Sequence, residues 1–189
     1  MSAAPDLAGC TVIYGGSFNP PHIAHQMTLL YLLEALGAES VLVVPARTHP
    51  LGKELATFDE RVALCELMAE PFGERVRVSR VEDELGGAGR TYDLLVHLRT
   101  TMPREKLVLS VGADILGETD RWYRWDDIVA MVPVVILGRK GFPDPRALPV
   151  ELPEVSSTHI RELRREGKSI RGLVPSNVAR RIERRGLYA

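Results

Sequence analysis

The chain has 189 residues, 45% of them hydrophobic, and a formal net charge of −1 at pH 7, which suits one compact domain over residues 1–189. The balanced charge argues against a protein that coats nucleic acid, and two cysteines argue against a disulfide scaffold and for a reduced, cytoplasmic protein. No apolar run has the length of a membrane span, and the first residues lack the pattern of a signal peptide.

In chain order, short apolar runs alternate with helical stretches. A strand is expected at 11–14, a helix at 22–36, a strand at 41–44, a helix at 58–70 and a strand at 75–81. The second half continues with a helix at 91–101, strands at 107–111 and 132–137, a proline-rich loop at 141–153, and helices at 158–166 and 176–185. This alternation predicts an α/β fold in which a parallel sheet carries helices on both faces.

Three segments that follow predicted strands contain glycine and polar residues. They are residues 15–17, 45–53 and 112–114. In a parallel sheet, ligands bind beyond the carboxyl ends of the strands. We therefore expect the three segments to converge on one crevice.

The strongest chemical signal follows the first strand and reads Gly15-Gly16-Ser17-Phe18-Asn19-Pro20-Pro21-His22-Ile23-Ala24-His25. The glycines let the backbone approach a ligand closely, and the free N–H groups of the following helix favour an anion. His22 and His25 are three residues apart and therefore share one face of the first turn. Two imidazoles beside an anion site suit a polyphosphate. A zinc site of the His-x-x-His type has no evident third ligand, and a purely structural role for the pair is the less favoured interpretation.

A second pattern typical of anion binding lies in a basic segment. Residues 156–189 contain nine Lys or Arg and three Asp or Glu, a net charge of +6. Ser156, Ser157 and Thr158 open a helix with hydroxyl and N–H groups, and Arg161 follows one turn later with a planar guanidinium. Alone, this pattern is more typical of an ordinary helix cap and a solvated helix face. Beside the first motif it indicates binding of phosphate groups.

The first motif resembles that of the nucleotidyltransferase superfamily with a His-x-x-His or His-x-Gly-His signature. Residues 155–161 resemble its second phosphate-binding motif, and the continuation to Gly186-Leu187-Tyr188 resembles the end of bacterial nicotinate-nucleotide adenylyltransferases. Segments 112–114 and 122–125 also match that family, so the resemblance covers nearly the whole chain. It implies a Rossmann-like fold and transfer of AMP from ATP to nicotinate mononucleotide, giving deamido-NAD and pyrophosphate in NAD biosynthesis. Mg²⁺ would be bound with ATP.

The resemblance also implies roles for individual residues, while no residue is expected to be a metal ligand. Trp122 matches the position that stacks on the pyridine ring, and Arg61 is expected to orient a neighbouring loop rather than touch the reacting atoms. The implied ATP-binding residues are Gly15, Gly16, Ser17, Phe18, His22, His25, Gly112, Asp114, Ser157, Thr158 and Arg161, of which His22, His25 and Arg161 are catalytic. The implied mononucleotide-binding residues are Asn19, Lys53, Thr91, Tyr92, Trp122 and Tyr123.

Three departures from the family pattern leave the acceptor open. Asn19 stands where the bacterial enzymes usually have Asp, His49–Lys53 replaces a Pro-His-Lys sequence, and Arg90–Asp93 replaces Ser-Tyr-Thr. Nicotinamide mononucleotide or dual specificity is therefore the first alternative. Pantetheine-phosphate adenylyltransferase and a catalytically silent nucleotide sensor are weaker alternatives. A homo-oligomer is possible, whereas no nucleic-acid or membrane partner is expected.

Overall fold

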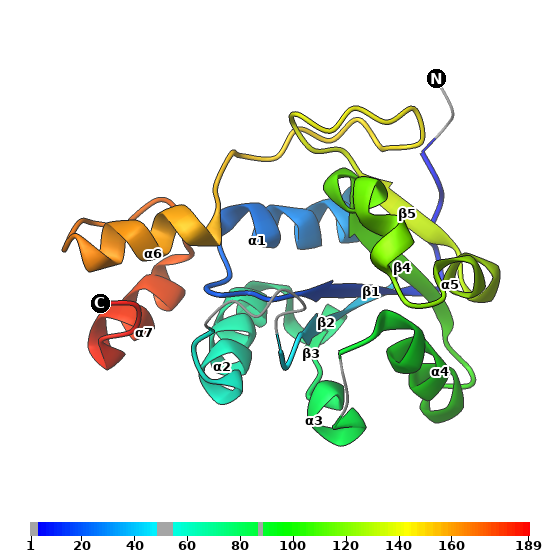
Figure 1. Ribbon diagram of the computed structural model, residues 1–189, viewed down its shortest axis with the longest axis horizontal. Helices are drawn as coiled ribbons and strands as arrows, with labels where there is room; N and C mark the ends of the chain where they lie inside the picture. Colours follow the sequence, from blue (N-terminus) through cyan, green and yellow to red (C-terminus); the bar gives the residue numbers. More distant parts are fainter. Residues whose placement is uncertain (1–3, 49–54, 87–88) are drawn as a thin grey trace.

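The computed structural model describes residues 4–48, 55–86 and 89–189 and has a five-stranded parallel sheet at its centre (Figure 1). The strand order is β3-β2-β1-β4-β5, so the chain builds outward from the central β1 first in one direction and then in the other. Such a reversal creates a crevice at the carboxyl ends of the two strands where the order changes, here β1 and β4. The strands are β1 (Cys10–Gly16), β2 (Ser40–Pro45), β3 (Val76–Val78), β4 (Lys106–Gly112) and β5 (Val134–Leu137).

Helices cover both faces of the sheet, which confirms the predicted α/β architecture. Figure 1 shows α1 and α4 on opposite sides of it. In the described part of the chain, no helix is long and apolar enough to cross a membrane. The α-helices are α1 (Ile23–Leu30), α2 (Phe58–Ala69), α3 (Val81–Leu85), α4 (Thr91–Thr101), α5 (Trp125–Met131), α6 (Ser157–Arg165) and α7 (Ser176–Arg185), with further helical turns at η1 (Tyr31–Ala35), η2 (Glu70–Arg75) and η3 (Ala113–Arg121).

Alternating side chains of the central strands enter two separate cores. On β1, Val12 packs into the core beneath α1, α2, α6 and α7, whereas its neighbour Ile13 packs into the core beneath α3, α4 and α5. Val43 and Leu42 of β2 divide in the same way. Because successive side chains of a strand point to opposite faces, an apolar run buried on both sides forms the centre of the sheet.

The predicted strand at 75–81 is wrong in its second half. Only Val76–Val78 pairs with β2, and the chain then turns into α3. Ser79 Oγ accepts a hydrogen bond from the Val81 N–H at 3.2 Å, which stabilises that turn. Val76 and Val81 are both buried, but they belong to different cores. The apolar alternation therefore reflects two burial sites rather than one continuous strand.

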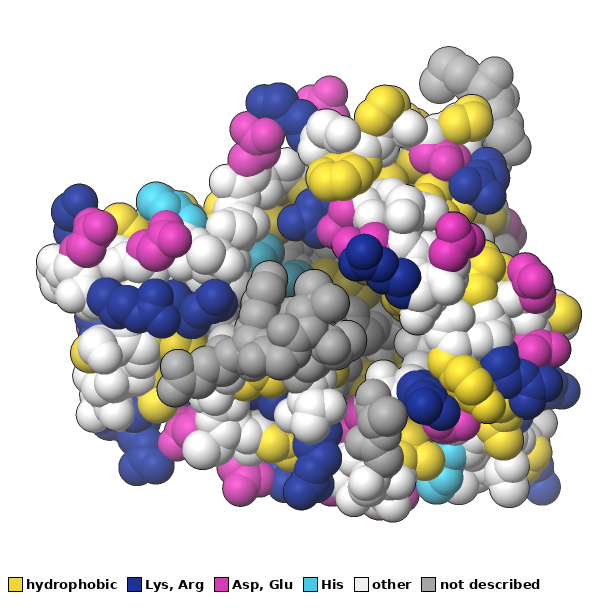
Figure 2. Space-filling view, in the orientation of Figure 1, with side chains coloured by type: hydrophobic (Ala, Val, Ile, Leu, Met, Phe, Trp, Pro, Cys, Tyr) yellow, Lys and Arg dark blue, Asp and Glu magenta, His cyan; other side chains and the backbone are white. Residues whose placement is uncertain are grey.

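The C-terminal helices are joined to the rest of the fold by polar contacts. Glu60 at the start of α2 pairs with Arg181 and Arg185 of α7 at 3.1 and 2.9 Å. Figure 2 shows Lys and Arg side chains gathered where α6 and α7 meet. Part of the basic charge of residues 156–189 is therefore used to hold α7 against α2.

Candidate functional site

His22 and His25 lie together where β1 leads into α1. His22 is the N-terminal cap of α1, and its backbone N–H donates to Nδ1 of His25 at 3.1 Å. Their rings stack with centroids 3.6 Å apart and an interplanar angle of 20°. The predicted common face is therefore confirmed. Because Nδ1 of His25 accepts, the neutral His25 ring carries its proton on Nε2.

Both imidazoles are neutral at pH 7. Burial, followed by the nearby positive charge of Arg139, lowers the pKa of His22 to about 4. Burial, His22 and Arg139 hold the pKa of His25 well below its ordinary value. Nδ1 of His22 is buried and, among the described residues, has no hydrogen-bond partner. The pair therefore offers N–H donors without adding a charge of its own.

The glycines before the histidines shape this part of the site. Gly15 is exposed, and a side chain there would meet no atom within 4 Å, so the end of β1 is open. A Cβ at Gly16 would lie 3.1 Å from the ring of Phe18, which is 2% exposed. That ring packs edge-on against His25 at 4.9 Å. Phe18, predicted as an ATP-binding residue, thus supports the His25 ring from inside the protein.

The second motif lies against the first. Ser156 caps α6, and its Oγ accepts from the His159 N–H at 3.1 Å. Ser157 Oγ donates to the Pro20 carbonyl at 2.9 Å, and Arg161 Nη1 donates to the Asn19 carbonyl at 2.8 Å. The two motifs, which the family resemblance assigns to one triphosphate, therefore lie together in the fold although more than a hundred residues of sequence separate them.

The second nitrogen of the Arg161 guanidinium, Nη2, reaches the hydroxyl of Thr158 at 3.3 Å. Thr158 is exposed and Arg161 is half-buried. The fork is thus anchored on one side by the Asn19 carbonyl while its outer edge faces the exposed start of α6. Such an anchored guanidinium is preorganised for phosphate oxygens.

Arg61 joins the two loops beside the histidine pair. Its side chain is fully buried and donates to four backbone carbonyls, at distances of 2.6–3.1 Å. These hydrogen bonds disperse the buried charge, and no carboxylate among the described residues pairs with Arg61. Asn19, 3% exposed, adds a fifth connection, because its Oδ1 accepts from the Ala56 N–H at 3.1 Å. Arg61 therefore orients the loops, as expected; its acceptors are the carbonyls of Ser17, Ala46, Arg47 and Ala56.

At the end of β4, Asp114 folds back over Gly112. A Cβ on Gly112 would collide with Oδ1 of Asp114, so a side chain at this position would displace the Asp114 carboxylate. Oδ2 of Asp114 pairs with Arg139 Nη1 at 2.7 Å. Sequence reasoning missed Arg139, although it follows β5 at the same carboxyl edge of the sheet as the three predicted segments. Its positive charge is, after burial, one of the causes that lower the pKa of His22 and of His25.

Four of the residues predicted to bind the mononucleotide lie on two segments that contact each other. Tyr92 in the first turn of α4 and Tyr123 between η3 and α5 meet edge to face, with ring centroids 5.9 Å apart. Trp122 contacts Trp125 in the same manner at 5.3 Å, and both are half-buried against the α4–α5 core. Thr91 is half-buried at the start of α4. Lys53 and His49 lie outside the described residues.

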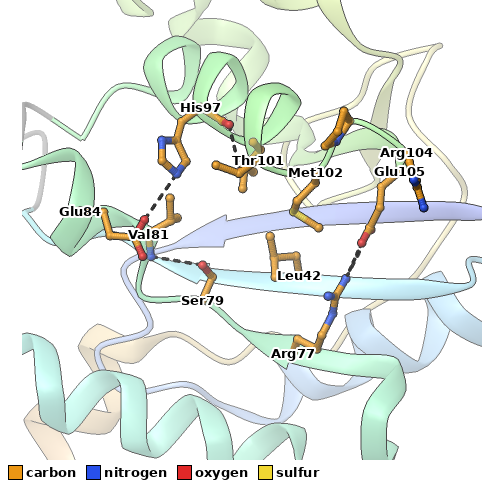
Figure 3. Close-up of a pocket in the computed structure, with 12 residues that line it drawn as sticks. Leu42, Arg77, Ser79, Val81, Glu84, His97, Thr101, Met102, Arg104 and Glu105 are labelled. Carbon is orange, nitrogen blue, oxygen red and sulfur yellow. Dashed lines mark hydrogen bonds and ion pairs between the residues drawn. The ribbon is translucent and has the colours of Figure 1, made fainter.

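A cavity of about 610 Å³ lies elsewhere, between the β2–β3 edge of the sheet and helices α3 and α4 (Figure 3). Its apolar floor includes Leu42, and ion pairs Arg77–Glu105 and Glu84–His97 bridge its walls at 3.2 and 3.5 Å. None of the predicted site residues lines it. Within residues 4–48, 55–86 and 89–189, no group of three or more His, Cys, Asp or Glu side chains could hold a metal ion.

Comparisons with known proteins agree with this geometry. A family model described as cytidylyltransferase-like matches residues 13–163. The chain is 42% identical to the “Probable nicotinate-nucleotide adenylyltransferase” of Anaeromyxobacter dehalogenans strain 2CP-1, over 100% of this chain and 99% of that protein. It is 36% identical to the protein of the same name from Myxococcus xanthus, over 93% of each.

Among solved structures, the fold is similar to Plasmodium falciparum nicotinic acid mononucleotide adenylyltransferase complexed with NaAD. The TM-score is 0.78 at 20% sequence identity, and the match covers 94% of this chain and 96% of that one. At this identity the likeness establishes the fold, which is the Rossmann-like nucleotidyltransferase arrangement with strand order β3-β2-β1-β4-β5.

Proposed function

Because the chain belongs to the nicotinate-nucleotide adenylyltransferase family, we propose that it transfers AMP from ATP to nicotinate mononucleotide, giving deamido-NAD and pyrophosphate in NAD biosynthesis. The observation that carries this proposal is the stacked, neutral His22–His25 pair beside the start of α6. We treat residues 1–189 as one functional unit, in which segment 156–189 completes the nucleotide site, and we place the reaction in the cytoplasm.

In this proposal the triphosphate of ATP lies along the two motifs. The open backbone at Gly15 and Gly16, the hydroxyls of Ser17 and Thr158, the N-terminus of α1 and the backbone N–H of Ser157 at the start of α6 surround it with donors. Nε2 of His25 donates to a phosphate oxygen, and Arg161 presents the outer edge of its fork. Mg²⁺ enters as part of the nucleotide substrate, bound through phosphate oxygens and water.

An oxygen of the mononucleotide 5′-phosphate then attacks the α-phosphorus of ATP. The bond from the α-phosphorus to the bridging oxygen breaks, and its electron pair leaves with pyrophosphate. The attacking phosphate is already ionised near pH 7, so no side chain has to remove a proton. Catalysis consists of positioning the two phosphates and stabilising the charge that develops between them, which fixed N–H and guanidinium donors do well.

The remaining site residues hold the two sugars and the pyridine ring. Asp114 is oriented by Arg139 and can accept hydrogen bonds from the hydroxyls of the ATP ribose. Trp122 offers a flat surface to the pyridine ring, whose positive charge in the mononucleotide adds a cation–π attraction. Asn19, Thr91, Tyr92 and Tyr123 surround the acceptor, and the family resemblance adds Lys53 on its phosphate.

The test is to incubate the purified protein and MgATP with one acceptor at a time and to measure pyrophosphate. Nicotinate mononucleotide, nicotinamide mononucleotide and pantetheine phosphate are the three acceptors. We expect the highest kcat/KM with nicotinate mononucleotide and no turnover with pantetheine phosphate. Turnover of pantetheine phosphate alone would identify a different adenylyltransferase, and no pyrophosphate with any acceptor would indicate a nucleotide sensor.

A further inference from the structure

Two arginines and two tyrosines form a continuous chain of side-chain contacts at the acceptor end of the site. The guanidinium carbon of Arg90 lies 4.3 Å from the centroid of the Tyr123 ring. The guanidinium carbon of Arg124 lies 4.1 Å from the centroid of the Tyr92 ring, and the two tyrosine rings meet edge to face. We call these four residues the arginine–tyrosine cluster. It joins the start of α4 to the turn between η3 and α5.

The topology places this cluster at the carboxyl edge of the sheet. Helix α4 follows the parallel strand β3 and precedes β4 in the chain. A helix that connects two parallel strands begins near the carboxyl edge of the sheet, so α4 begins there. Helical segment η3 begins directly after Gly112, the last residue of β4. Both halves of the cluster therefore lie at the carboxyl edge of the sheet, where the histidine pair also lies.

The two arginines differ in their charge balance. Nε of Arg124 donates to Oδ2 of Asp127 at 2.6 Å, so the charge of Arg124 is compensated. Arg90 has no carboxylate within 4.0 Å among the residues that the structure describes. Its side chain is exposed and is held by the Tyr123 ring. A guanidinium stacked on a tyrosine keeps its N–H groups free at the edge for an anion.

The two candidate acceptors differ at one group. Nicotinate mononucleotide carries a carboxylate on its pyridine ring, and nicotinamide mononucleotide carries a neutral carboxamide there. The ring itself is positively charged in both. A nearby cation therefore repels the ring of the amide acceptor, whereas the carboxylate of the acid acceptor compensates that repulsion and accepts a charge-assisted hydrogen bond.

We propose that Arg90 is a specificity-determining residue, whose guanidinium, stacked on Tyr123, binds the pyridine carboxylate and selects nicotinate over nicotinamide mononucleotide. This inference rests on the proposed function and deepens it. Arg124 does not share the role, because Asp127 already neutralises it. Arg124 instead positions Tyr92 through the contact between their side chains.

The experiment compares the wild type with Arg90→Gln, which keeps a polar side chain and removes the charge. Both acceptors compete in one reaction with MgATP, and the ratio of the two dinucleotide products gives the ratio of their kcat/KM values. We expect kcat/KM for nicotinate mononucleotide to fall by about 10- to 100-fold, the range of one charged hydrogen bond, while the value for nicotinamide mononucleotide stays the same or rises. Arg90→Lys should recover part of the ratio.

Arg99→Gln is the matched control, because Arg99 is exposed in the last turn of the same helix, away from the cluster. Its product ratio and the KM for ATP should equal those of the wild type. Equal loss of both acceptors in Arg90→Gln, or an unchanged ratio, would show that Arg90 is only structural. A wild type that turns over neither pyridine acceptor would overturn the proposed function itself and this inference with it.

Discussion

The backbone N–H of His22 donates to Nδ1 of His25 at 3.1 Å, so one imidazole both caps the first turn of α1 and keeps its proton on Nε2. A side chain at the third helical position that accepts from the N-cap N–H is one half of a capping box, a place where Gln and Glu are common. His25 therefore makes two contributions: its Nδ1 stabilises the first turn of α1, and its Nε2–H serves the proposed reaction.

His25→Ala removes both contributions, and His25→Gln removes only the second, because the Gln amide oxygen can accept the same N–H. We expect turnover to fall by at least about 100-fold in both variants, as for loss of a preorganised donor to developing charge. Only His25→Ala should lose stability, by about 1 kcal/mol for the missing cap. Steady-state kinetics and urea unfolding measure the two effects, and near wild-type turnover in either variant would remove His25 from the mechanism.

The pKa of His22 predicts how stability depends on pH. It is about 4 in the folded protein and near 6.5 in the unfolded chain, so between these values the unfolded state binds more protons. Folding stability should therefore fall as the pH is lowered from about 6.5 to about 4, with His22 contributing up to about 3 kcal/mol. Above pH 6.5 this contribution is fully present and constant.

Unfolding in urea at several pH values, with His22→Gln beside the wild type, measures the contribution of His22 by difference. The variant should lose less stability than the wild type on acidification, since Gln does not titrate. Parallel stability curves for the two proteins would contradict the low pKa of His22.

Arg161→Lys keeps the charge at the start of α6 but loses the planar fork, one arm of which is anchored on the Asn19 carbonyl. We expect the KM for ATP to rise about 10-fold, the cost of one charge-assisted hydrogen bond, with the KM for the mononucleotide little changed. Arg165→Lys, exposed in the last turn of the same helix, should leave both values unchanged. A rise confined to the mononucleotide KM would reverse the assignment of the two substrates.

The sequence predicted those features of the fold and the site that depend on local patterns. The apolar runs of β1, β2 and β4 and the spacing of His22 and His25 are such patterns, because burial and helix geometry act directly on neighbouring residues. The family resemblance assigned both Ser17 and Ser157 to the phosphates of ATP, but the contact of α6 with Pro20 is seen only in the folded chain.

The sequence missed elements too short to show a period and features that depend on contacts between distant residues. The seven residues of α5 are too few to show a helical period, and the alternation at 75–81 hides a change of core between Val76 and Val81. Arg139 follows Gly138 after β5, but no histidine stands beside it to mark the segment as an anion site. Only the folded chain brings it to Asp114 and within electrostatic range of the histidines.

Arg139 therefore provides the last prediction. Its charge is the second cause, after burial, of the low pKa of His22, and it also lowers the pKa of His25. Arg139→Gln should raise the pKa of His22, although burial keeps it below 6.5, and it should leave Asp114 without its ionic partner. Because Asp114 then loses its orientation and the phosphates lose a nearby cation, we expect the KM for ATP to rise as well.

Imidazole resonances followed by NMR against pH, together with ATP kinetics, measure both effects. Arg146→Gln is the control, since among the described residues Arg146 forms its ion pair with Asp144 on the following loop. If the His22 titration is the same in Arg139→Gln and in the wild type, the charge of Arg139 does not act on the histidine pair.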